Sequence, residues 1–174
     1  MHGTFVEALL APGPHPSLGA HAETYARLIG SWRGDVHNHM PGKSVPAASV
    51  EAHFAWVLDG RAVQDVWITP ARGDRGAENG ATLDWFGATL RVFDAPSEAW
   101  RTVWTDPVSR FRIELVGRRQ GEDIVQIGTR DGRPIRWTFS NIRADSFTWQ
   151  GHILGFDGET WQLEVDIQFR RQRA

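Results

Sequence analysis

His53 and Asp65 are the two residues whose placement most suggests chemistry. Each interrupts an apolar, strand-like stretch, and the two stretches are joined by Asp59-Gly60, a dipeptide typical of tight hairpin turns. Counting outward from that turn places His53 and Asp65 roughly opposite each other on paired strands. If buried, such a pair is a candidate for general acid–base catalysis; if it faces outward, it only contacts solvent. The alternation of residues does not assign the faces, so both interpretations stay open.

His37 and His39 lie on one face of a strand-like segment, with Asp35 beside them. This is a spacing that metal ligands use. A metal site of this kind also needs a carboxylate a few residues further on, and the first glutamate after His39 is Glu51. We therefore expect a solvated strand end here, with no metal, and the sequence indicates no cofactor.

The chain is rich in aromatic residues, with nine Trp and nine Phe but a single Tyr. Such rings can fill a core, or they can line a cavity, because several large rigid rings are harder to interlock than aliphatic side chains. The tryptophans predicted to line a cavity are Trp67, Trp85, Trp104, Trp137 and Trp149. The polar residues predicted to contact a ligand there are Gln64, Asp65, Arg91 and Gln126. A register slip of one residue would reverse these assignments.

Composition restricts the class of protein. The chain has 174 residues, no cysteine and a formal net charge of −2, so disulfides and thiolate chemistry are excluded and nothing indicates a nucleic-acid partner. We find no signal peptide and no apolar run of membrane-spanning length, and therefore expect a cytoplasmic protein without a membrane partner. Residues 1–16 lack periodicity and are predicted to form a flexible arm before a barrel domain at 17–174; a homodimer is left open.

The hydrophobic pattern predicts one short helix followed only by strands. Leu18, Ala22, Tyr25, Leu28 and Ile29 share a helical face, with Ser17 as a candidate cap and Gly30 as the end. Beyond residue 31, apolar and polar residues alternate in segments separated by turns, as in 161–170. About ten strands with short connections predict an all-β fold, an antiparallel up-and-down β-barrel, because closure removes the exposed edges.

Gly30-Ser31-Trp32, a G-x-W sequence that follows the helix and begins the first strand, resembles the calycin superfamily of lipocalins and fatty-acid-binding proteins. The resemblance implies that Trp32 plugs the closed end of the barrel and that an arginine of the last strand, Arg170 or its neighbour Arg171, packs over it; we take Arg170 as the candidate. The chain is also similar to bacterial lipocalin-like proteins of unassigned activity. The similar stretches are 59–70, 87–94, 123–129, 139–151 and 160–165.

The expected function is binding of a small, largely apolar organic molecule inside the barrel. One alternative is a cofactor-independent isomerase or cyclase of a natural-product pathway, with His53 and Asp65 as the catalytic pair. A further alternative is a haem- or metal-binding barrel, because LIGSWRG at 28–34 resembles nitrobindin-type haem barrels. That resemblance implies an iron-bound histidine near the C-terminus, and this chain has no histidine after His152.

Overall fold

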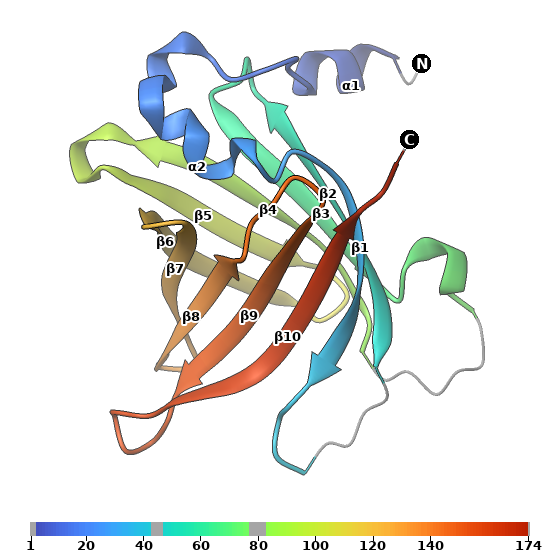
Figure 1. Ribbon diagram of the computed structural model, residues 1–174, viewed down its shortest axis with the longest axis vertical. Helices are drawn as coiled ribbons and strands as arrows, with labels where there is room; N and C mark the ends of the chain where they lie inside the picture. Colours follow the sequence, from blue (N-terminus) through green and yellow to red (C-terminus); the bar gives the residue numbers. More distant parts are fainter. Residues whose placement is uncertain (1–2, 43–46, 77–82, 174) are drawn as a thin grey trace.

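The computed structural model describes residues 3–42, 47–76 and 83–173, and its ten strands form a closed antiparallel barrel (Figure 1). The strands are β1 Gly30–Asn38, β2 Ala48–Val57, β3 Ala62–Thr69, β4 Trp85–Asp94, β5 Ala99–Asp106, β6 Phe111–Gln120, β7 Asp123–Arg130, β8 Arg133–Ser140, β9 Ser146–Leu154 and β10 Trp161–Arg171. Each strand pairs with its neighbours in sequence, and β1 pairs with β10 to close the barrel. The predicted up-and-down barrel is confirmed.

Alternation of buried and exposed residues explains why these segments form a barrel wall. In β10, Val165, Ile167 and Phe169 are buried, whereas Gln168 and Arg170, which follow Ile167 and Phe169, are exposed. Successive side chains of a strand point to opposite faces, so one set fills the interior and the other meets water. The strand predicted at 81–93 is observed as β4 from Trp85; residues 81 and 82 lie outside the described residues.

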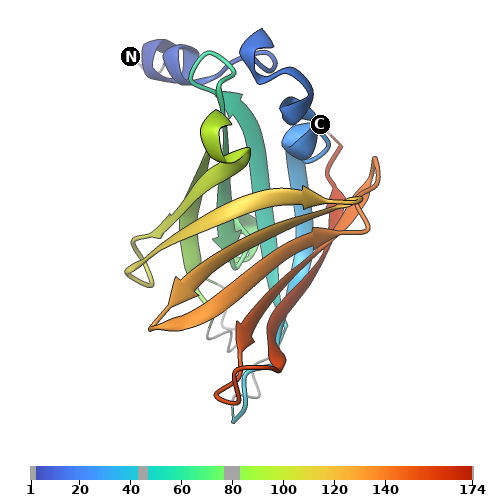
Figure 2. The ribbon, with the colours of Figure 1, turned by 90° about the vertical axis from the view of Figure 1, so that its left-hand side faces the viewer.

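The helical segments that precede β1 lie at one end of the barrel (Figure 2). The single helix predicted over 17–29 is observed as a 3-10 helix η1, Pro16–Ala22, followed by the α-helix α2, Glu23–Ala26. Gly19 interrupts the helical geometry with a φ of +51°, and His15, rather than Ser17, caps the segment by accepting a hydrogen bond from the Ser17 backbone. No helix in the described residues is long and apolar enough to cross a membrane.

The segment predicted as a flexible arm contains regular structure where it is described. Residues 3–9 form the helix α1, Gly3–Leu9, and Leu10 makes a β-bridge with Val57. The Ala11 amide donates to the Trp56 carbonyl oxygen at 2.9 Å. These backbone bonds to the β2–β3 hairpin explain the difference, because they leave no trace in side-chain periodicity.

Trp32 is fully buried near the start of β1, the strand that directly follows the helical segments η1 and α2. Its Nε1–H donates to the Leu28 carbonyl oxygen at 2.7 Å, and its ring packs edge-to-face on Phe147. The guanidinium of Arg171 lies 4.0 Å from the centre of the Trp32 ring. Trp32 therefore occupies the position that the calycin resemblance implies for it.

Arg171, not Arg170, packs over Trp32, so the assignment to Arg170 is wrong. Trp32 pairs with Arg171 and Arg33 pairs with Arg170, and paired residues share a face of the sheet. Arg171 thus points toward the barrel end, where it donates to backbone carbonyl oxygens of Arg27, Ile29 and Ala144 at 2.6–3.2 Å. The exposed Arg170 faces the other way.

We expect Arg171→Ala to lower the free energy of unfolding by about 2 kcal/mol, because hydrogen bonds from a charged donor and the contact with Trp32 are lost. Trp32→Ala should cost about 3–5 kcal/mol, as for other large-to-small core changes. Arg170→Ala is the matched control and should leave stability nearly unchanged. Urea denaturation measures all three; equal effects of the two arginine variants would contradict the assignment.

Candidate functional site

The barrel encloses a cavity of about 380 Å³ at the end opposite the helical segments. The position follows from the lining: β5 and β7 contribute residues near their C-terminal ends, and β4, β6 and β10 contribute residues near their N-terminal ends. In an up-and-down barrel those ends all meet on one side, away from Gly30 where β1 begins. The lining residues include Trp67, Leu83, Trp85, Thr89, Arg91, Trp104, Asp106, Phe111, Ile113, Trp137, Phe139, Trp149 and Val165.

Indole rings form much of the cavity wall. The ring centres of Trp67 and Trp149 are 5.4 Å apart, those of Trp149 and Trp137 are 5.6 Å apart, and those of Trp137 and Trp104 are 6.4 Å apart. All three contacts are edge-to-face, a geometry that aromatic quadrupoles favour. These rings form a connected series along the inside of β3, β5, β8 and β9.

Glycines give the indoles room against the wall. A Cβ on Gly151 would lie 3.0 Å from the Trp149 ring, and a Cβ on Gly87 would overlap the Trp104 ring. Both glycines lie inside strands, where glycine often marks a close approach of another group. The two glycines therefore allow the rings to lie flat instead of being pushed into the cavity.

A buried ion pair forms the floor of the cavity. Arg91 Nη1 lies 2.5 Å from Asp65 Oδ2, and the two side chains are 1% and 0% exposed. The other carboxylate oxygen, Oδ1, accepts a hydrogen bond from the Thr89 amide at 3.1 Å. Arg91 Nε donates to Gln126 Oε1 at 3.1 Å, and the Tyr25 hydroxyl donates to the same oxygen at 3.0 Å. The Arg91 charge is thus neutralised within the protein.

Aromatic rings surround the Arg91 guanidinium, whose central carbon lies 5.0 Å from the ring centre of Tyr25, 5.7 Å from that of Phe54 and 5.8 Å from that of Phe139. Burial raises the pKa of the Tyr25 hydroxyl to about 12, although the charge of Arg91 partly offsets the shift. Tyr25 therefore remains a neutral hydrogen-bond donor at physiological pH.

The mouth of the cavity carries a second ion pair. Arg130 Nη2 contacts both carboxylate oxygens of Glu164, at 2.6 and 2.8 Å. Arg130 ends β7 and Glu164 belongs to β10, so the pair reaches across the inner face of β8 and β9. Both residues line the cavity together with Met40 and the half-exposed Phe111. The charges of this pair are therefore balanced against each other.

Asp106 is the remaining charged residue of the lining. Its carboxylate accepts hydrogen bonds from the Val108 amide at 2.9 Å and from the Ser109 hydroxyl at 2.6 Å, in the turn between β5 and β6. These are the contacts of a residue that shapes a turn. Its hydrogen bonds are made within the chain, and it has no cationic partner among the described residues.

The structure places six of the nine predicted ligand-binding residues in the cavity lining: Trp67, Trp85, Arg91, Trp104, Trp137 and Trp149. Asp65 and Gln126 are buried behind Arg91 and position it. Gln64 does not belong to the lining, because it neighbours Asp65 on β3 and so points to the opposite face.

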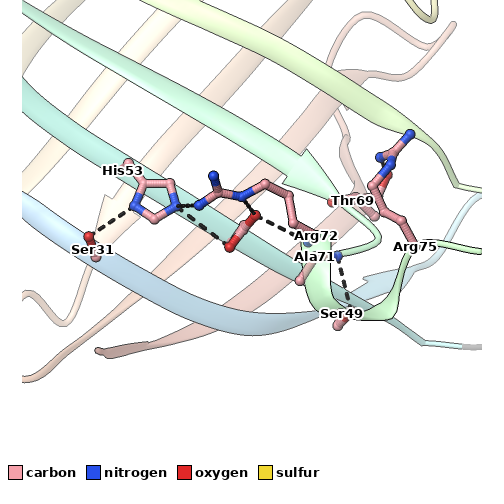
Figure 3. Close-up of polar contacts among 8 residues, drawn as sticks. Ser31, Ser49, His53, Thr69, Ala71, Arg72 and Arg75 are labelled. Atoms are coloured by element: carbon pink, nitrogen blue, oxygen red, sulfur yellow. Dashed lines mark hydrogen bonds and ion pairs between the residues drawn. The ribbon is translucent and has the colours of Figure 1, made fainter. Parts of the chain in front are cut away.

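His53 and Asp65 do not form the predicted catalytic pair. Asp65 pairs with Phe54, whereas His53 pairs with Val66, so the two side chains lie on opposite faces of the sheet. On the outer face, His53 Nδ1 lies 2.9 Å from the Ser31 hydroxyl and Nε2 lies 3.3 Å from Arg72 (Figure 3). Counting outward from the Asp59-Gly60 turn misplaces the register by one residue, and this shift is enough to put His53 on the opposite face of the sheet.

The outer cluster around His53 attaches the segment after β3 to the barrel wall. Arg72, in the short 3-10 helix η2, Arg72–Asp74, contacts the Glu51 carboxylate at 2.5 Å. Burial raises the pKa of Glu51, but hydrogen bonds from the Arg72 side chain and amide outweigh it and hold this pKa below its ordinary value. Asp74 contacts Arg33 of β1 at 2.5 Å. These contacts are structural, and none reaches the cavity.

The two histidines with metal-ligand spacing do not gather further ligands. His39 Nε2 lies 2.5 Å from Asp166 of β10. Within the described ranges, no group of three histidine, cysteine, aspartate or glutamate side chains comes together as a metal site would require. No histidine belongs to the cavity lining, and His152 follows the lining residue Gly151, so it points outward. The described cavity wall thus offers no imidazole for a haem iron.

Several lining residues were not predicted. Thr89 and Ile113 were within reach of the pattern, because Thr89 lies two residues before Arg91 and Ile113 pairs with Trp104. Met40 and Ser109 lie outside the strands, where no alternation applies. Arg130 and Glu164 are 34 positions apart in sequence and meet only because the barrel closes.

Comparison with known proteins supports the fold and no further assignment. No model of a known protein family matches the chain, and no curated protein sequence matches it. The chain is similar to the crystal structure of Rv2717c from M. tuberculosis, with 18% identity, a TM-score of 0.64, and coverage of 94% of this chain and 99% of that one.

The chain is also similar to the S-type phycobiliprotein lyase CPES from Guillardia theta, with 15% identity, a TM-score of 0.56, and coverage of 87% and 92%. At these identities the two similarities show the calycin-like barrel fold alone.

We expect Asp65→Leu to destabilise the protein by about 3–5 kcal/mol, because it leaves the buried Arg91 charge unpaired. Arg91→Met should be destabilising for the converse reason. The double variant Asp65→Leu, Arg91→Met should regain most of the loss, since neither charge remains. Urea denaturation of the four proteins forms a double-mutant cycle; additive effects would contradict a tight pair.

Tyr25 is the only tyrosine, so its ionisation can be followed by the near-ultraviolet absorbance of tyrosinate. We expect it to titrate near pH 12 in the folded protein, against 10.0 for an ordinary tyrosine. Because the folded-state pKa is raised, its stabilising contribution is complete below pH 10 and is lost as pH rises toward 12. Tyr25→Phe should lack this alkaline loss. A titration at the ordinary value in folded protein would contradict the burial.

Proposed function

We propose that the protein binds a small, largely apolar organic molecule inside the barrel. The observation that carries the proposal is the cavity of about 380 Å³, in a barrel whose other end is filled by its own side chains. Ligand sites for small molecules span roughly 300–1,000 Å³ and combine apolar walls with a few polar groups. Here five tryptophans supply the wall, and Thr89 and Arg91 supply polar groups near the floor.

Packing of aromatic side chains alone does not account for this space. Phe147, Phe169 and Trp32 interlock at the helical end, where Phe147 and Phe169 stack at 4.6 Å. At the end opposite the helical segments, equally large tryptophan rings line the cavity instead of filling it. Empty volume in a core costs stability, so a protein that keeps it does so for a reason other than packing. The fold shared with a phycobiliprotein lyase is compatible with such use of a barrel.

The arrangement favours binding over catalysis. An isomerase or cyclase without a cofactor needs an acid–base group that can reach the bound molecule. His53 lies on the outer face, and Asp65 is fully engaged by Arg91 and Thr89. The Asp106 carboxylate is held by the turn that it shapes, and the Glu164 carboxylate is paired with Arg130. Among the described residues, the polar groups that remain at the cavity wall, such as Thr89 and Arg91, can orient a ligand.

A neutral fluorescent probe, N-phenyl-1-naphthylamine, tests the proposal. We expect saturable binding with enhanced emission, and a rise in melting temperature with probe concentration, because only the folded barrel binds it. Ile113→Trp places a bulky indole ring in the cavity and should weaken binding at least tenfold. Val116→Trp on the same strand points outward and is the matched control, expected to bind as the wild type does.

Absence of saturable binding by the wild type would contradict the proposal, as would equal binding by the Ile113→Trp variant. A native mass spectrum of freshly purified protein would show any retained ligand directly. The same spectrum gives the subunit count and so decides between monomer and homodimer.

A further inference from the structure

We infer that the ligand carries a positive charge on a largely apolar body, such as a quaternary or tertiary ammonium group, which the indole rings of Trp104 and Trp137 contact and the Asp106 carboxylate attracts. This inference rests on the proposed function and specifies the chemical class that the cavity takes. Three observations carry it: the balance of charge around the cavity, the position of Asp106, and the rings whose surface is open to a guest.

The charges around the cavity do not cancel. Among the described lining residues, Arg91 and Arg130 are cationic, and Asp106 and Glu164 are anionic. Arg91 is paired with Asp65 behind it, and Arg130 is paired with Glu164. Two guanidinium groups thus meet three carboxylates in this part of the chain, which leaves the charge of Asp106 in excess. A negative charge in excess attracts a cation and repels an anion.

Asp106 lies on the inner face of β5, two residues after Trp104 and opposite Phe111 of β6. Its hydrogen-bond donors, two backbone amides and the Ser109 hydroxyl, are neutral groups that hold the carboxylate in place without cancelling its charge. Asp106 is 1% exposed, so water screens its charge little, whereas Arg110 of the same turn is exposed and well screened. A charge in such surroundings acts beyond direct contact. The attraction therefore does not require the carboxylate to touch the ligand.

The rings that a ligand can touch are those with accessible surface inside the cavity. Trp85, Trp104 and Trp137 belong to the lining and are only partly buried, so the surface that they leave open faces the cavity. The ring centres of Trp104 and Trp137 are 6.4 Å apart, and their planes meet at 81°. Two nearly perpendicular indoles form a corner, and the faces of such rings attract cations, those of quaternary ammonium ligands included.

A neutral apolar ligand would use only part of this arrangement. It would gain contact with the rings, but it would displace water from the cavity and leave the charge of Asp106 without a counter-charge in apolar surroundings. A quaternary ammonium ion supplies the counter-charge. Its methyl groups donate no hydrogen bonds to water, so it loses less on leaving water than a primary ammonium ion does.

Three probes of one shape test the inference in the wild-type protein by calorimetry and thermal shift. They are benzyltrimethylammonium (cation), neopentylbenzene (its neutral isostere) and phenylmethanesulfonate (anion). We expect the cation to bind about tenfold more tightly than the neutral isostere, the factor that the ring contact and the opposite charge together supply. The anion should bind most weakly of the three.

Asp106→Asn keeps the size of the side chain and an acceptor oxygen for the turn, and it removes the charge. We expect the preference for the cation over the neutral isostere to fall from about tenfold to about twofold, the part that the rings alone supply. Asp94→Asn is the matched control. It removes the same charge at the C-terminal end of β4, where Asp94 pairs with Arg101 away from the cavity, and should leave the preference unchanged.

Trp104→Leu tests the contribution of the rings. It should weaken binding of the cation about fivefold and binding of the neutral isostere less, because a cation gains more from an indole face. The control is Trp161→Leu, which removes an indole that packs on Arg136 and does not line the cavity. The comparison of the three probes in the wild type does not depend on any variant folding.

Binding of neopentylbenzene or phenylmethanesulfonate by the wild type as tight as that of benzyltrimethylammonium would overturn the inference, as would an undiminished preference in Asp106→Asn. In these cases the cavity still binds a small molecule, and the proposed function stands. If none of the three probes binds but N-phenyl-1-naphthylamine does, the inference alone fails. If that probe does not bind either, the proposed function fails with it.

Discussion

The ion pair between Asp65 and Arg91 is the contact on which the interior of this barrel depends. An unpaired charge inside an apolar core is unfavourable by several kcal/mol, so each of the two residues fixes the place of the other. The pair also recruits Gln126 from β7 and, through it, Tyr25 from the segment that leads into the barrel. This ion pair, with its two hydrogen-bonded neighbours, thus fixes the positions of β3, β4, β7 and the helix α2 relative to one another.

The position of this pair divides the interior into two parts with different properties. On the helical side, Trp32, Phe147 and Phe169 pack against one another and against Arg171, and the core is filled. On the other side the tryptophans stand around open volume. Because Arg91 is held from below by Asp65 and Gln126, it cannot move up to fill that volume. The floor of the cavity is therefore as rigid as the hydrogen-bonded strands β3 and β4 that carry Asp65 and Arg91.

The sequence predicted the barrel well because alternation of apolar and polar residues is a direct record of which face of a strand is buried. Six of the nine predicted ligand-binding residues line the cavity for the same reason. The wrong predictions assign residues to the wrong face of the sheet. His53, Gln64 and Arg170 each lie one position from a residue on the inner face, and a shift of one position moves a side chain to the opposite face. The contact between Arg91 and Asp65 depends on the register of two adjacent strands, and the contact between Arg130 and Glu164 depends on how the barrel curves and closes. No local pattern in the sequence contains either.

The ion pair between Arg130 and Glu164 has a consequence for exchange between the cavity and the surroundings. The two residues come from strands separated by β8 and β9, so their contact forms a clasp over part of the mouth. A molecule that passes this clasp must break it on the way in and again on the way out. A barrier common to both directions slows association and dissociation by the same factor and leaves the equilibrium unchanged. The two side chains are only 25% and 16% exposed, so dissolved salt screens the pair weakly, and the exchange rate of a molecule held under the proposed function should depend little on ionic strength.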